Sequence, residues 1–202
     1  MIIPCFSVHR SKQVVPPGKL AEVLEMAVTR AKNICSCCKI GIPKSVGLAY
    51  KDSNPNNIAD SNVYAVCKLC EALFKGGKLN ANSDYGVMIY LPQMSQVEVI
   101  RLVHALYNLE RMGRHTPLLV NKKENFKSLR KITEKLHGTC DIDAFSEVLK
   151  NMKSEAYELR STGLGGLRFW PDAEDFKTHL RNYSASFLEE NDLDNYISSK
   201  FK

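Results

Sequence analysis

Apolar residues recur at helical spacing in several stretches of the chain, and turn signals separate these stretches. The clearest stretch begins at Ser95, which forms the capping-box pattern of a helix start with Glu98, and Gly113 marks its end. Another helix is predicted over residues 19–33, where apolar side chains fall on one face. They are Leu20, Val23, Leu24, Ala27, Val28 and Ala31. The pattern therefore predicts amphipathic helices that each bury one side.

Further helices and a few short strands complete the prediction. Helices are expected over residues 121–137, after a cap at Asp141 and after a cap at Asp172. Residues 163–166, which are rich in glycine, are predicted to form a turn. Short apolar runs predict strands over residues 2–8, 45–50 and 86–92.

This order of elements indicates an α+β protein that is mainly helical. Residues 1–85 are predicted to form a cysteine-bearing module with an N-terminal helix, and residues 86–202 a strand and helical region packed on it. The two parts are either separate domains or one continuous domain. A composition of 44% hydrophobic and 25% charged residues over 202 positions fits a globular protein.

Charge and hydropathy constrain the expected cellular location of the protein more than its function. The sequence has neither a run of 18 apolar residues nor a signal-peptide pattern, so a cytoplasmic location is expected. The net charge of +6 permits contact with nucleic acid, acidic proteins or a membrane surface and requires none of them. Residues 121–135 carry six basic and two acidic side chains, which predicts a solvated helix face or a surface for an acidic protein or nucleic acid.

Four of the seven cysteines form two C-x-x-C pairs, Cys35 with Cys38 and Cys67 with Cys70. Each such turn directs two sulfurs to one point, so the two turns together can surround a metal ion, and four thiolates favour Zn²⁺. Cys37 is a spare thiol inside the first pair, so the sequence does not fix which two cysteines of that triplet bind. Reduced core cysteines and a thioredoxin-like redox pair are the alternatives. We expect structural Zn²⁺ with a closed coordination shell made by Cys35, Cys38, Cys67 and Cys70.

The segment from Asn62 to Cys70 resembles the back half of an HNH (ββα-metal) nuclease module. Active HNH enzymes carry a histidine in the first strand and another after the last cysteine, whereas here residues 46–50 lack histidine and Glu71 follows Cys70. Phosphodiester hydrolysis would then lack its general base and a metal ligand, so no enzymatic activity is expected. Asn62 is expected to order its loop. A second metal at Asp52 and Glu71, DNA binding or cleavage by an HNH-type protein, and a zinc-ribbon-like nucleic-acid binder remain as alternatives.

Two other segments resemble the IcmJ/DotN family of Dot/Icm (type IVB) secretion systems. Residues 87–98 (VMIYLPQMSQVE) are similar to the family's "IYLPE-(L/M)-(S/T)-Q-x-E" segment, and Arg168–Pro171 to its terminal "R-x-L-P". The two cysteine pairs lie in register with those of the family. The similarity extends in patches over about residues 30–190.

The resemblance implies a non-enzymatic zinc adaptor in the cytoplasmic coupling complex at the inner membrane. Its partners would be the C-terminal region of the coupling ATPase DotL and other subunits of the complex, which recruit substrates. No small-molecule substrate or nucleic-acid partner is implied, and contact with the membrane would be indirect. His104 is expected to serve packing, and Trp170 to anchor the core or to meet a partner.

Overall fold

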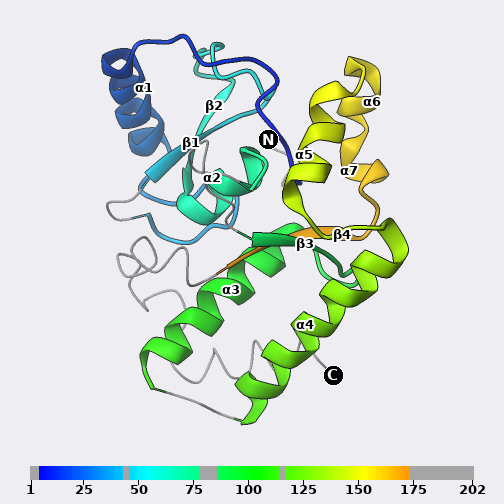
Figure 1. The fold of residues 1–202 in the computed structure, drawn as a ribbon. Coiled ribbons are helices and arrows are strands. Elements are labelled where there is room, and N and C mark those ends of the chain that lie inside the picture. The colour runs from blue at the N-terminus through cyan, green and yellow to red at the C-terminus, as the bar shows by residue number, and fades with distance from the viewer. Residues whose placement is uncertain (1–4, 43–45, 78–85, 114–116, 173–202) are drawn as a thin grey trace.

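The computed structural model describes residues 5–42, 46–77, 86–113 and 117–172, with side chains omitted over 117–123 and 125–127. Two two-stranded antiparallel sheets lie among the helices, so the expected mixture of helix and sheet is confirmed. In Figure 1, α3 and α4 extend below the β3–β4 sheet, and α5 to α7 lie at the upper right. The elements are α1 (Pro17–Arg30), β1 (Val46–Tyr50), β2 (Val63–Cys67), α2 (Lys68–Phe74), β3 (Gly86–Tyr90), α3 (Gln96–Arg111), α4 (Pro117–His137), α5 (Ile142–Asn151), α6 (Ser154–Glu158), α7 (Arg160–Gly163) and β4 (Leu167–Pro171).

The first sheet is a hairpin whose second strand leads directly into α2. Val46 pairs with Cys67 at one end, and Tyr50 pairs with Val63 at the other. The loop between the strands is ordered by Asn62, whose Oδ1 accepts from the N–H of Asp52 at 3.0 Å. Asn62 Nδ2 also donates to a loop carbonyl at 2.7 Å, so the predicted structural role of this residue is confirmed. Two antiparallel strands followed by a helix is the order of elements in a ββα module.

A buried glutamine closes the outer edge of β4. Ser95 and Glu98 form the predicted capping box, which starts α3 at Gln96. The Gln96 side chain donates to the carbonyl of Phe169 and accepts from its N–H, both at 2.8 Å. Because Gln96 is buried, these bonds satisfy both backbone groups that Phe169 directs away from β3. The side chain thus takes the place of a third strand.

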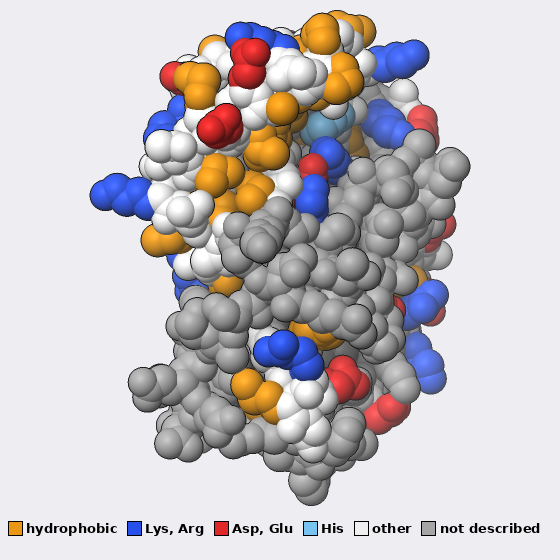
Figure 2. Space-filling model, turned by 90° about the vertical axis from the view of Figure 1, so that its left-hand side faces the viewer, with side chains coloured by type: hydrophobic (Ala, Val, Ile, Leu, Met, Phe, Trp, Pro, Cys, Tyr) orange, Lys and Arg blue, Asp and Glu red, His pale blue; other side chains and the backbone are white. Residues whose placement is uncertain are grey.

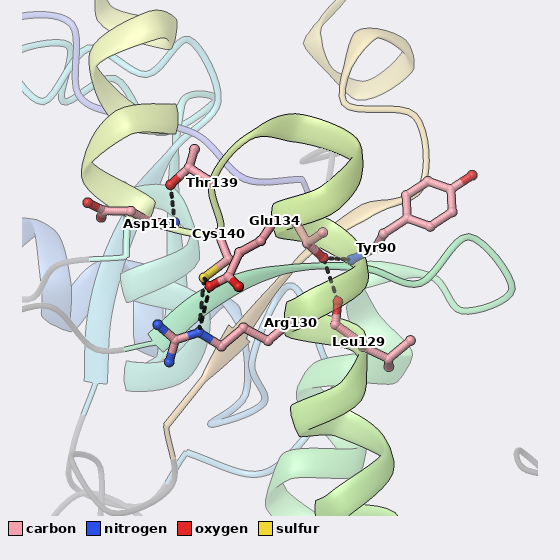
Figure 3. Close-up of polar contacts among 8 residues, drawn as sticks. Tyr90, Leu129, Arg130, Glu134, Thr139, Cys140 and Asp141 are labelled. Atoms are coloured by element: carbon pink, nitrogen blue, oxygen red, sulfur yellow. Dashed lines mark hydrogen bonds and ion pairs between the residues drawn. The ribbon is translucent and has the colours of Figure 1, made fainter.

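The outer edge of β3 is closed by α4 and the connection after it. The N–H of Tyr90 donates at 2.6 Å to the hydroxyl of Thr133, which itself donates to the carbonyl of Leu129 (Figure 3). The N–H of Met88 donates at 2.9 Å to the carbonyl of Cys140. Both edges of this sheet are therefore occupied by other parts of the chain.

Residues from both halves of the chain share one buried cluster. Phe6 and Phe169 contact each other with ring centroids 5.8 Å apart, although 163 positions separate them. The hydroxyl of Tyr157 accepts from the N–H of Val8 at 3.1 Å and lies 2.9 Å from Ser53 Oγ. The division at residues 85 and 86 remains a proposal, and the packing across it is continuous.

Several local predictions differ from the structure. Residues 5–8 of the predicted first strand are not a strand, because Ser7 hydrogen-bonds to the end of α2 and has no neighbouring strand. The helix predicted at residue 121 begins at Pro117, whereas the Asp141 cap of α5 is confirmed. The strand β4, α6 and α7 were not predicted. The helix expected after Asp172 lies outside the described residues, within which no helix is long and apolar enough to cross a membrane.

Candidate metal centre

The first cysteine pair lies on a knuckle that follows α1. Lys32 and Asn33 adopt positive φ angles of 52° and 57°, which turn the chain sharply after the helix. The N–H of Cys35 then donates to the carbonyl of Ile40 at 2.8 Å, and the carbonyl of Cys35 accepts from the N–H of Lys39 at 3.0 Å. This loop holds the sulfurs of Cys35 and Cys38 on one side of the turn.

The second pair joins the hairpin to the helix after it. Cys67 is the last residue of β2 and the N-cap of α2, and Cys70 lies in the first turn of α2. The positive end of a helix dipole favours nearby negative charge, so this position suits thiolates. The register of β1 and β2 brings the second pair beside the first.

The four sulfurs of Cys35, Cys38, Cys67 and Cys70 all lie within 4.8 Å of one another. The Sγ atoms of Cys38 and Cys67 are 3.7 Å apart, and a tetrahedral site with Zn–S bonds of about 2.3 Å requires sulfur separations of about 3.8 Å. All four residues are buried with no measurable exposure. The cluster therefore has the size and seclusion of a site for a single metal ion.

Cys37 lies outside this group, although it belongs to the same triplet and is also buried. The geometry thus groups Cys35 and Cys38, the expected ligands of the triplet, with the second pair. Their role as ligands is still a prediction.

Burial favours the protonated form of three of the four thiols, because it raises the pKa of Cys38, Cys67 and Cys70. Burial raises the pKa of the Cys67 and Cys70 thiols well above their usual value. Burial also acts to raise the pKa of Cys35, but hydrogen bonds from the Cys38 and Cys67 thiols outweigh it and hold that pKa low. A divalent ion bound by the four sulfurs would displace the protons that burial favours. A donor set of four sulfurs fits Zn²⁺ well.

Helix α3 supplies contacts to the cysteine cluster that the sequence did not reveal. His104 Nε2 lies 3.7 Å from Cys67 Sγ, and burial lowers the pKa of this histidine to about 4. Arg101 Nε donates at 2.8 Å to the carbonyl of Cys38. The packing role expected for His104 therefore includes direct contact with the cluster. Spacing gave no signal for this contact, because both side chains are far from the cysteines in sequence.

The alternative second metal site at Asp52 and Glu71 is not formed. Glu71 is buried, and its two carboxylate oxygens each lie 2.6 Å from a lysine ammonium, those of Lys68 and Lys75. Asp52 instead accepts hydrogen bonds from its own loop. Among the described residues, the four cysteines are the single group of three or more metal-type side chains close enough to share an ion.

Fold and site together define a helix-rich α+β protein built around a buried four-cysteine centre that can bind a metal ion. No family model matches the chain. The chain is similar to the type 4 apparatus protein DotN of Legionella pneumophila, with 24% identity over 165 residues, or 80% of this chain and 77% of the relative. The prediction of a DotN/IcmJ-like protein is confirmed by this comparison.

Proposed function

We propose that the protein is a non-enzymatic zinc-binding adaptor of a type IVB secretion coupling complex. It would bind the C-terminal region of the coupling ATPase in the cytoplasm, beside the inner-membrane complex, and help to recruit substrates. The observation that carries this proposal is the similarity to DotN over four fifths of the chain. The buried cysteine cluster adds a physical reason, because it suits a structural ion better than a reactive one.

The proposed ion is Zn²⁺ held by Cys35, Cys38, Cys67 and Cys70. Four sulfur ligands fill a tetrahedral shell and leave no position for a substrate or an activated water. The ion would join the knuckle after α1 to the start of α2, and so stiffen a part of the chain whose described residues contain a single hairpin. Residues 1–85 would then be a degenerate HNH-like module on which the remainder packs.

The polar groups around the hairpin support a loss of nuclease chemistry. Both carboxylate oxygens of Glu71 bind lysines, and the side chain of Asn62 is engaged on both its oxygen and its nitrogen. His104 contacts Cys67 from α3 and is remote in sequence from the strand that carries the general base in active HNH enzymes. These arrangements favour a scaffold.

The test is co-expression of the chain with the C-terminal region of the coupling ATPase from the same genome. We expect the two to copurify in a 1:1 complex with one zinc ion per adaptor chain, by size-exclusion chromatography and elemental analysis. Separate elution of the two proteins at micromolar concentration would contradict the adaptor role.

The hairpin–helix order and the cysteine pairs also favour a second candidate, an HNH-type DNA-binding or DNA-cleaving protein. Incubation of the purified chain with plasmid DNA and Mg²⁺ or Mn²⁺ tests it. Nicking that disappears in Asn62→Ala would establish the nuclease and remove the adaptor proposal. DNA binding that weakens steeply with salt, without nicking, would indicate a zinc-ribbon-like binder.

A further inference from the structure

The strand edges differ in whether the chain itself occupies them. Both edges of the β3–β4 sheet are closed, by Gln96 on one side and by Thr133 with the carbonyl of Cys140 on the other. An edge with free N–H and C=O groups is a template for another strand, and native proteins usually cover it. Of the two sheets in the described residues, the β1–β2 hairpin is therefore the one that can still have an unpaired edge.

The outer edge of β2 is also closed. The carbonyl of Ala65 accepts from the N–H of Ser36 at 3.0 Å. The N–H of Cys67 donates to Cys35 Sγ at 3.3 Å. The knuckle of the cysteine cluster thus lies along β2 and uses its outward groups.

In the part of the chain that the structure describes, the outer edge of β1 has no such partner. In an antiparallel pair, residues that face each other direct their backbone groups the same way, inward or outward. Leu48 faces Ala65, whose carbonyl points outward, and Tyr50 faces Val63. The backbone N–H and C=O of Leu48 and the N–H of Tyr50 therefore point away from β2. Within the described residues, no hydrogen bond engages the backbone of Leu48 or the N–H of Tyr50. This edge is open to a further strand.

A groove of about 310 Å³ lies along β1. One wall is apolar and comes from α1, and residues of β1 itself also line the groove. Figure 2 shows this face of the molecule, where apolar side chains gather beside a histidine and a group of charged side chains. The apolar wall consists of Leu20, Ala21 and Leu24.

The other wall comes from α2 and its C-terminal end, and it carries the side chains of Lys68, Glu71 and Lys75. Glu71 packs so closely against Gly47 that a Cβ at that glycine would lie 2.3 Å from the Glu71 carboxyl carbon. Lys68 and Lys75 bind this carboxylate and remain 22% and 26% exposed, whereas Glu71 is 7% exposed. The two partly exposed ammonium groups on this wall can meet an acidic side chain of a bound segment.

We propose that an extended segment of the coupling ATPase's C-terminal region adds to β1 as a third strand in this groove, an inference that rests on the function proposed above. Its backbone pairs with Leu48 and Tyr50. Because side chains alternate across a strand, one face of the segment meets Leu20 and Leu24 and the other meets the lysines. The segment therefore alternates apolar and acidic residues over about four to six positions. A helix would not supply N–H and C=O groups to the open edge.

Amide hydrogen exchange tests this arrangement directly. The probes are overlapping peptides that cover the coupling ATPase's C-terminal region, added to the zinc-bound full chain. We expect the bound peptide to slow exchange at Leu48 and Tyr50 by at least about tenfold. The amides of Gly47 and Ala49 already face β2, so their exchange should change far less. This alternation distinguishes strand addition from any other contact at the groove.

A matched pair of charge substitutions locates the peptide. Ala21→Glu puts a charge into the apolar wall, and Met26→Glu puts the same charge on an exposed part of α1 that does not line the groove. We expect Ala21→Glu to raise the peptide Kd about tenfold and Met26→Glu to leave it unchanged. Leu48→Pro removes an outward N–H but no hairpin bond, so binding should be lost while zinc content and circular dichroism are kept.

The outcomes separate this inference from the proposed function. Binding of the ATPase region with unchanged exchange at Leu48 and Tyr50, or equal affinities for the two α1 variants, would overturn the strand model and leave the adaptor role intact. If no peptide and no longer ATPase fragment binds, both proposals fall. An unfolded Leu48→Pro variant leaves the exchange pattern and the α1 pair to decide.

Discussion

Replacement of Cys38 by serine tests the metal centre against an internal control one residue away. Cys38 belongs to the four-sulfur cluster and is fully buried, whereas Cys37 is equally part of the triplet but lies outside the cluster. The two serine variants change the same atom in adjacent residues. A general sensitivity of this loop to serine would therefore affect both.

The size of the effect follows from the coordination number. Structural Zn²⁺ contributes about 10–16 kcal/mol of binding free energy in zinc-finger peptides, so one of four equivalent ligands accounts for about 2.5–4 kcal/mol. For a chain of about 200 residues, each 1 kcal/mol shifts the melting temperature by about 2–4 °C. We therefore expect Cys38→Ser to lower the melting temperature by on the order of 10 °C.

The assay combines elemental analysis with differential scanning calorimetry on both variants and the parent. Cys38→Ser should bind zinc far more weakly, and Cys37→Ser should retain one ion per chain and melt close to the parent. An unchanged zinc content and melting temperature in Cys38→Ser would refute the four-ligand assignment. Loss of zinc from Cys37→Ser would show that the ligand set is wrong in its first pair.

Three further substitutions test packing and ionisation elsewhere. Burial lowers the pKa of His9 from 6.5 to about 4. The resulting contribution to the free energy of unfolding, at most about 3 kcal/mol, is present above pH 6.5 and is lost as the pH falls towards 4. At fixed zinc content, His9→Gln should therefore flatten the pH dependence of the unfolding free energy measured in urea over this range. Gly47→Ala should cost about 1–3 kcal/mol because the new Cβ meets Glu71, whereas Gly41→Ala, with nothing within 4 Å, should be silent in the same assay. Thr133→Val leaves a β3 N–H without its acceptor and should cost about 1–3 kcal/mol in thermal unfolding, and Thr133→Ser should not.

Local signals in the sequence were sufficient for the starts of α3 and α5 and for the grouping of the four cysteines. The capping box at Ser95 and the cap at Asp141 depend on residues two or three positions away, and both form as predicted. The paired cysteines likewise carry their geometry in their spacing. Features of this kind are readable because the interacting groups are close along the chain.

The missed elements depend on partners that are distant in sequence. The strand β4 has five residues and exists because Phe169 faces Met88 across the sheet, 81 positions away. Its alternating burial is too short to distinguish it from a loop after Gly166. The contact of His104 with Cys67 also spans 37 positions. Such pairings require the folded chain, which is why the open edge of β1 could not be derived from the sequence.

Tyr157 matters for any attempt to move the four-cysteine site into another protein. Its hydroxyl holds the backbone of Val8 and the side chain of Ser53, so a helix near the end of the described chain fastens its beginning and the loop after β1. A fragment that ends before α3 would lack this fastening, and also the contacts of Arg101 and His104 with the cysteine pairs. The site is thus not an independent module, and a protein that receives it by grafting would also need α3 and α6.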